Sequence, residues 1–131
     1  MFDNKLMSGK KGLVMGVAND RSISWAIAKK AYEYGAELAF TYQGDALGKR
    51  VIPLGKSVGS NIILPCEVSE ASSIKNVFEK INSEWGKLDF VIHGIAFSDK
   101  EELKGQYIDT TRSNFTNTME ISVYSFTEVS K

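Results

Sequence analysis

The chain has 131 residues, its 16 Lys and Arg balance 16 Asp and Glu, and 43% of its residues are hydrophobic. This composition predicts one folded domain and excludes a disordered segment. The formal net charge of zero disfavours a nucleic-acid partner, because general polyanion binders carry clustered Lys and Arg.

One Cys and one His are too few for an intramolecular disulfide or a structural zinc site, so we expect no metal. No apolar run approaches the roughly 18 residues of a membrane span. Residues 1–11 lack the apolar segment of a signal peptide. We therefore expect a cytoplasmic protein with no membrane partner.

Short apolar runs alternate with helical patterns along the whole chain. Residues 12–16 (GLVMG) suit a buried strand, and the apolar spacing after Ser22 predicts a helix that Gly35 ends. A second strand at residues 37–42 precedes a weaker helical segment at 46–58, which Pro53 and Gly55 interrupt.

Residues 61–64 predict a third strand, and the clearest amphipathic stripe predicts a helix over 72–85 that Gly86 ends. A fourth strand at 88–93 leads into a polar segment at 98–110 and a last helix. That helix carries one apolar stripe of Phe115, Met119, Ser122 and Phe126. Four aromatic residues are assigned to the core: Trp25, Phe78, Trp85 and Phe90.

This alternation predicts an α/β fold, a doubly wound parallel sheet of about four strands in the order βαβαβαβα, Rossmann-like in type. Ligands of such sheets bind where the strands' carboxyl ends meet at the reversal of winding. Function should therefore lie just after each strand, in four places: residues 16–23, Gln43, residues 66–68 and residues 93–98.

The loop at residues 16–23 joins the first strand to the first helix, where a pyrophosphate would meet backbone N–H groups and the helix dipole. Gly16 permits a tight turn, and Ser22 can cap the helix and reach a phosphate oxygen. The same residues are also common loop chemistry, and the G-x-G-x-x-G pattern is absent. The loop alone leaves both interpretations open.

Two polar residues follow the second and third strands. Gln43 can bond a ribose hydroxyl but offers a 2′-phosphate no charge, which favours NADH over NADPH. Lys49 and Arg50 would weaken that inference if they folded back, although a surface position suits them better. Glu67 could accept a bond from an adenine amino group, or it is an exposed loop carboxylate.

His93 and Cys66 are the residues that most invite a catalytic interpretation. No nucleophile or acid partner is identifiable around His93, which favours a hydrogen-bonded histidine at a strand end. No neighbouring cation is evident to lower the pKa of Cys66, which favours a packed small side chain.

Five blocks in order carry a resemblance: GKKGLVMGVANDRSISWAIA, GAELAFTYQ, Cys66-Glu67-Val68, HGIAF at 93–97 and ISVYSF at 121–126. Together, over residues 8–131, they resemble the bacterial NADH-dependent enoyl-acyl-carrier-protein reductases, a divergent branch of the short-chain dehydrogenase/reductase family. The most specific blocks are the loop from Gly16 to Ser22-Ile23 and the Phe-Thr-Tyr-Gln ending at Gln43. The implied function is hydride transfer from NADH to the double bond of a trans-2-enoyl thioester in fatty acid biosynthesis.

The resemblance also implies which residues bind the cofactor and border the substrate. On the pyrophosphate and nicotinamide side it implies Gly16, Ala18, Ser22 and Ile23. Around the adenosine and its ribose it implies Gln43, Glu67, Val68, Gly94 and Ile95, with Ile121 behind the cofactor. Phe97 and Ser98 would border the acyl substrate. The family usually has Asp at the Glu67 position, so this longer side chain must retract or rotate.

The family's catalytic Tyr-x6-Lys pair would lie beyond Lys131. The resemblance therefore implies that residues 1–131 are the N-terminal portion of a single NAD-binding domain, an incomplete sheet with no catalytic group and no activity alone. Tyr124 and Lys131 have the same spacing, but they follow HGIAF one strand and one helix too early. We assign Tyr124 to helix packing.

An oligomer is expected on two grounds. The fourth strand presents an apolar edge, and Ile121 and Tyr124 add a second apolar face to the last helix. The resemblance implies a homotetramer.

Two alternative functions remain. A carbonyl-reducing short-chain dehydrogenase is disfavoured by HGIAF, and a non-catalytic nucleotide-binding module of flavodoxin-like topology would suit the short length.

Overall fold

The computed structural model describes residues 5–131. Its strands are β1 (Lys11–Met15), β2 (Glu37–Tyr42), β3 (Ile62–Pro65) and β4 (Phe90–His93). Helices α1 (Ile23–Glu33), α2 (Gly44–Ser57) and α3 (Ala71–Trp85) connect them. After β4 come two 3₁₀ turns, η1 (Glu101–Leu103) and η2 (Tyr107–Asp109). The last helix follows as α4 (Arg112–Met119), a π-helical turn η3 (Glu120–Tyr124) and α5 (Ser125–Val129).

The four strands form one parallel sheet in the order β3-β2-β1-β4. Leu13 of β1 lies between Ala39 of β2 and Val91 of β4, so β1 is paired on both sides. The chain winds from β1 outward to β3 and then crosses back to β4. The predicted doubly wound sheet is confirmed, and the reversal of winding falls between β1 and β4.

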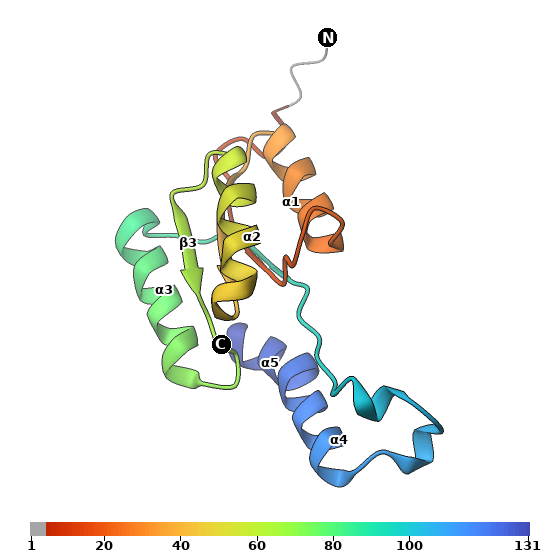
Figure 1. Ribbon diagram of the computed structural model, residues 1–131. Coiled ribbons are helices and arrows are strands. Elements are labelled where there is room, and N and C mark those ends of the chain that lie inside the picture. The colour runs from red at the N-terminus through yellow and green to blue at the C-terminus, as the bar shows by residue number, and fades with distance from the viewer. Residues whose placement is uncertain (1–4) are drawn as a thin grey trace.

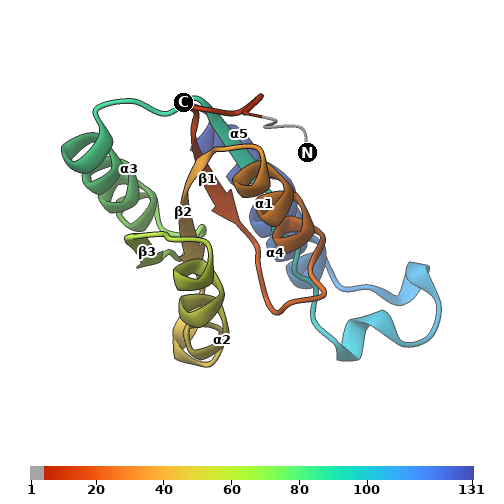
Figure 2. The ribbon, with the colours of Figure 1, turned by 90° about the horizontal axis from the view of Figure 1, so that it is seen from above.

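Helices cover both faces of the sheet (Figures 1 and 2). On one face α1 and α2 pack against Val14 and Phe40, with the Trp25 ring centroid 6.1 Å from that of Phe40. On the other face α3 and α5 pack against Leu13 and Met15. Strands buried on both sides explain the continuous apolar runs of the sequence.

Helix α1 is confirmed, but its buried side chains are Ser24, Trp25 and Ala28. Ile23 and Ile27, two of its apolar residues, are exposed. Trp25 is buried as predicted, whereas Phe78, Trp85 and Phe90 are only half-buried at the margins of the core.

Helix α2 is continuous, so the predicted interruption at Pro53 and Gly55 is wrong. Pro53 is exposed, so the Lys49 carbonyl that loses its helical partner there can bond water. Gly55 is buried against Ile63 and Phe40, where a side chain would collide with Ile63. The glycine is therefore a close-packing position of the helix.

The last helix extends with the 98–110 segment away from the sheet (Figure 1). Ser125 and Val129 are its buried residues, and Val129 joins the core beside Leu13. Phe115, Met119 and Phe126 of the predicted stripe are exposed. Among residues 5–131, no helix is both long and apolar enough to cross a bilayer.

Candidate functional site

A cavity of about 470 Å³ lies where the carboxyl ends of β1, β2 and β4 meet the last helix. This volume is within the range of small-molecule sites. The cavity borders the reversal of winding, where such sheets bind ligands. Nine of the predicted site residues line it: Gly16, Ala18, Gln43, Glu67, Val68, Gly94, Ile95, Phe97 and Ile121.

The turn after β1 is shaped by two glycines. Gly16 has φ +91°, and a Cβ there would collide with the backbone carbonyl of Gly94. A Cβ at Gly94 would collide with Ser24 Oγ, which donates to the Met15 carbonyl at 3.1 Å. The two strand ends therefore present bare backbone beside the cavity, a surface that a dinucleotide's diphosphate can approach closely.

Ser22 occupies the N-cap position of α1 but makes no capping bond to the helix. Its hydroxyl oxygen instead accepts the N–H groups of Ala18, at 2.9 Å, and Asn19, at 3.1 Å. The predicted side-chain cap of α1 by Ser22 is therefore wrong, and these two N–H groups are already bonded within the loop. Since the oxygen accepts both bonds, the hydroxyl hydrogen remains to be donated to an anion.

Ser22 and Ile23 do not line the cavity, and Ile23 is 81% exposed. Ser98 lies outside it as well. Its hydroxyl accepts bonds from Asn114 Nδ2, at 3.2 Å, and Thr118 Oγ1, at 3.1 Å, so α4 holds it. The structure thus separates these three residues from the nine that it brings together.

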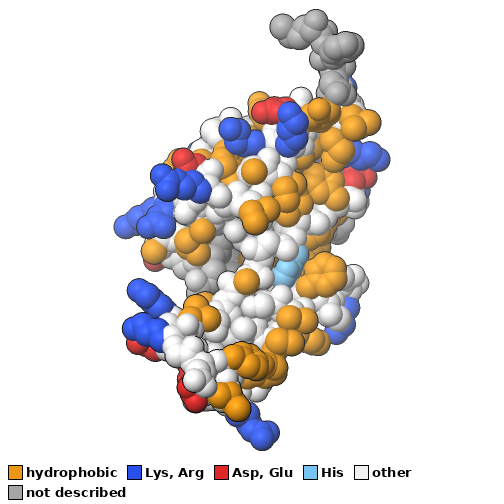
Figure 3. Space-filling view, turned by 90° about the vertical axis from the view of Figure 1, so that its right-hand side faces the viewer, with side chains coloured by type: hydrophobic (Ala, Val, Ile, Leu, Met, Phe, Trp, Pro, Cys, Tyr) orange, Lys and Arg blue, Asp and Glu red, His pale blue; other side chains and the backbone are white. Residues whose placement is uncertain are grey.

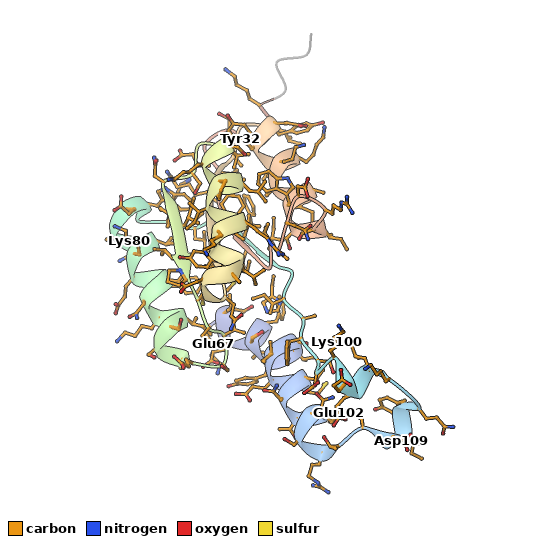
Figure 4. The ribbon with its side chains drawn as sticks, in the orientation of Figure 1. Tyr32, Glu67, Lys80, Lys100, Glu102 and Asp109 are labelled. Atoms are coloured by element: carbon orange, nitrogen blue, oxygen red, sulfur yellow. The ribbon has the colours of Figure 1, made fainter. Side chains whose placement is uncertain are left out.

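Gln43 and Glu67 meet across the ends of β2 and β3. Gln43 Nε2 donates to Glu67 Oε2 at 3.0 Å, and Ser69 Oγ donates to Glu67 Oε1 at 2.9 Å. Figure 4 shows Glu67 at the end of β3, near the beginning of α3. Burial alone would raise the pKa of Glu67, but these hydrogen bonds lower it below the usual value. Glu67 is therefore ionised at neutral pH.

The segment after β4 is fixed to the π-helical turn η3. The Phe97 N–H donates to Ser122 Oγ at 3.0 Å, and the Ser122 hydroxyl donates to the Phe97 carbonyl at 3.2 Å. One side chain thus satisfies both backbone groups of Phe97. Its ring remains half exposed at the cavity.

Residues 16–131 match a family model described as enoyl-(acyl carrier protein) reductase. This match covers most of the chain. The chain belongs to this reductase family. It is 61% identical over 98% of its residues to an NADH enoyl-[acyl-carrier-protein] reductase of Rhizobium meliloti, and covers 48% of that relative.

Two solved structures of the reductase family superpose closely on the chain. One is FabI from Candidatus Liberibacter asiaticus, with a TM-score of 0.92, 53% identity, and coverage of 95% of this chain and 48% of that one. The other is the Anaplasma phagocytophilum reductase in complex with NAD, with a TM-score of 0.90 and the same identity and coverage. The chain spans about half the length of the curated relatives it matches.

Three side chains set aside as catalytic candidates have structural surroundings of their own. His93 Nε2 lies 2.8 Å from Ser125 Oγ, which confirms the predicted hydrogen-bonded histidine. Cys66 is buried, and that burial raises the pKa of its thiol, which confirms the predicted packed side chain. Tyr124 is 48% exposed, and its hydroxyl accepts a bond from Lys131 Nζ at 3.3 Å. The assignment of Tyr124 to helix packing stays a prediction, because its half-exposed ring lies on the second apolar face of the helix.

Leu47 and Asn117 also line the cavity, although neither was predicted from the sequence. Asn117 precedes the predicted Ile121 by four residues, so helical periodicity would have placed both on one face. Leu47 lies in the first turn of α2, directly after Gln43. Leu47 was not predicted because the helical pattern of residues 46–58 is weak.

Proposed function

We propose that the protein is an NADH-dependent enoyl-acyl-carrier-protein reductase of fatty acid biosynthesis, and that this chain holds the adenosine and pyrophosphate half of its site. One observation carries the proposal. The cavity at the reversal of winding gathers nine of the residues that the family resemblance implies for cofactor and substrate. A nucleotide-binding module of similar fold would not need these nine residues at its cavity.

The residues of the chain divide the binding task. Bare backbone at Gly16 and Gly94 leaves room for the diphosphate, and the hydroxyl of Ser22 can donate to it. The Gln43 amide bonds the adenosine ribose, while Val68 and Ile95 offer apolar surface to the adenine. When bound, NADH supplies the hydride that reduces the carbon–carbon double bond of a trans-2-enoyl thioester.

The substrate end of the site is proposed at Phe97, whose backbone Ser122 fixes, with Ser98 and Ile23 beyond it. Ile121 backs the cofactor from the last helix. The acyl-carrier-protein thioester is the proposed partner, and the cytoplasm is the proposed compartment. We further propose that residues 1–131 form the N-terminal portion of a single NAD-binding domain, that they carry no catalytic group, and that the whole protein is a homotetramer.

The test follows nicotinamide absorbance when a protein of the relatives' length that contains this chain is mixed with NADH and a trans-2-enoyl thioester. We expect absorbance to fall with that substrate, and the 131-residue chain alone to bind NADH without turnover. A 3-oxoacyl thioester in the same assay examines the carbonyl-reducing alternative. Constant absorbance with the enoyl substrate would overturn the proposal.

A further inference from the structure

The Gln43–Glu67 hydrogen bond forms a wall between two cavities. The Cys66 N–H donates to the Tyr42 carbonyl at 2.8 Å, which places the residues that follow each strand side by side. Gln43 and Glu67 border the 470 Å³ cavity and also a second one of about 410 Å³ on the α3 side of the sheet. Whatever enters the first cavity at this corner meets the amide and the carboxylate together.

The bond fixes which way the Gln43 amide points. An ionised carboxylate only accepts hydrogen bonds, so the amide nitrogen must face Glu67 and the amide oxygen must face away. Glu67 is itself held, because Ser69 Oγ occupies its other oxygen and its own N–H donates to Ser73 Oγ at 2.8 Å. The corner therefore presents an acceptor oxygen beside a negative charge.

An acceptor and a negative charge distinguish the two nicotinamide cofactors. A ribose 2′-hydroxyl can donate to the Gln43 oxygen, whereas a 2′-phosphate has only acceptor oxygens and carries negative charge of its own. The nearby cations do not compensate. Lys49 and Arg50 are exposed on α2 and line neither cavity, and Lys80 is bonded to Glu84 at 2.6 Å.

We propose that Glu67 is a positioning residue for cofactor selectivity: it holds the Gln43 amide with its oxygen available to a ribose hydroxyl, and its charge rejects a 2′-phosphate. This inference rests on the proposed function and assigns its preference for NADH to the pairing of Glu67 with Gln43. The shorter Asp, which the resemblance implies at this position, keeps the charge. The hydrogen bond to Gln43 is what the longer Glu67 provides here.

The test compares Glu67→Gln with unchanged protein, both at the relatives' length, by measuring the dissociation constants of NADH and NADPH calorimetrically. A neutral side-chain amide both donates and accepts, so it no longer dictates the orientation of Gln43. We expect the ratio of NADPH to NADH dissociation constants to fall on the order of tenfold. The same direction is expected with 2′,5′-ADP against 5′-ADP, which probe the adenosine half alone.

Glu70→Gln is the matched control, because it removes the same charge three residues away and Glu70 lines neither cavity. We expect its selectivity ratio to equal that of unchanged protein. Glu67→Asp should retain most of the discrimination. If thermal melting shows that Glu67→Gln is unfolded, Ser69→Ala replaces it, since it removes the hydroxyl that helps to hold the Glu67 carboxylate and should shift the ratio in the same direction.

The outcomes separate the two proposals. Unchanged protein that fails to bind NADH overturns the proposed function. Unchanged protein that prefers NADH, together with a Glu67→Gln ratio identical to the control, overturns only the role of Glu67. A ratio that moves equally in Glu67→Gln and Glu70→Gln also overturns it, because net charge alone would then explain the shift.

Discussion

Gly16 meets two constraints at once. Its φ of +91° lies in the left-handed region, and its missing Cβ lets the backbone of Gly94 approach. The first constraint concerns the conformation of the turn, and the second concerns the distance between two strand ends. Both serve the corner of the cavity at which β1 and β4 diverge.

Replacing Gly16 with Ala should therefore lower the free energy of unfolding by more than backbone strain alone. Gly59 supplies the control, because it has φ +72° and nothing within 4 Å of an added Cβ. Strain of this kind costs about 1–3 kcal/mol, and the collision at Gly16 should add about 1–3 kcal/mol more. Urea denaturation measures both variants, and equal losses would contradict the steric argument.

A buried hydroxyl of the last helix is hydrogen-bonded to the sheet, in addition to the apolar packing of Val129. Ser125 Oγ donates to the Ile121 carbonyl at 2.6 Å, so its oxygen accepts the bond from His93 Nε2 of β4. Burial lowers the pKa of His93, so the imidazole is neutral at neutral pH. This link occurs directly after the π-helical turn, where the helix changes its hydrogen-bonding pattern.

Ser125→Ala should lower the free energy of unfolding by about 1–3 kcal/mol, because it strands a half-buried imidazole N–H and a carbonyl. Ser130→Ala is its control on the same helix, since the exposed Ser130 donates to the Phe126 carbonyl at 2.7 Å. That change should stay within about 0.5 kcal/mol. Similar midpoints for both variants in urea would show that the His93 contact contributes nothing.

At the scale of the whole molecule, the last helix exposes a group of apolar side chains. Phe115, Met119, Val123 and Phe126 of the last helix are exposed. Figure 3 shows one face of the protein with hydrophobic side chains across its middle and charged ones mostly at its margins. Apolar surface gathered on one helix is typical of a protein interface. This supports the proposed homotetramer.

Val123→Asp in a protein of the relatives' length should reduce the assembly, because a charge would be buried against apolar surface. Val123 is 51% exposed in the single chain, and Ile27 of α1, at 44%, provides a comparable position elsewhere. Analytical ultracentrifugation should find smaller species for Val123→Asp and an unaltered assembly for Ile27→Asp. An unaltered assembly in both cases would contradict an interface at this helix.

Most of this architecture follows from periodicity, since alternating apolar runs and helical stripes determine strands, helices and a parallel sheet. The prediction at Pro53 was wrong because the free-energy cost of a proline in a helix depends on whether the freed carbonyl reaches water. A sequence does not show this. The two N–H groups that donate to Ser22 are set by loop geometry, and the exposure of Tyr124 is set by tertiary packing. Residues directly after the strands were predictable because topology alone brings them together, whereas Leu47 and Asn117 reach the cavity from helices.

Ser122 serves both backbone groups of Phe97, 25 positions earlier in the chain, with one oxygen and one hydrogen. Threonine is the replacement that preserves both hydrogen bonds, because it too carries a hydroxyl on the β-carbon. A change to alanine would therefore release the chain beside the cavity while leaving every residue that lines the cavity unchanged.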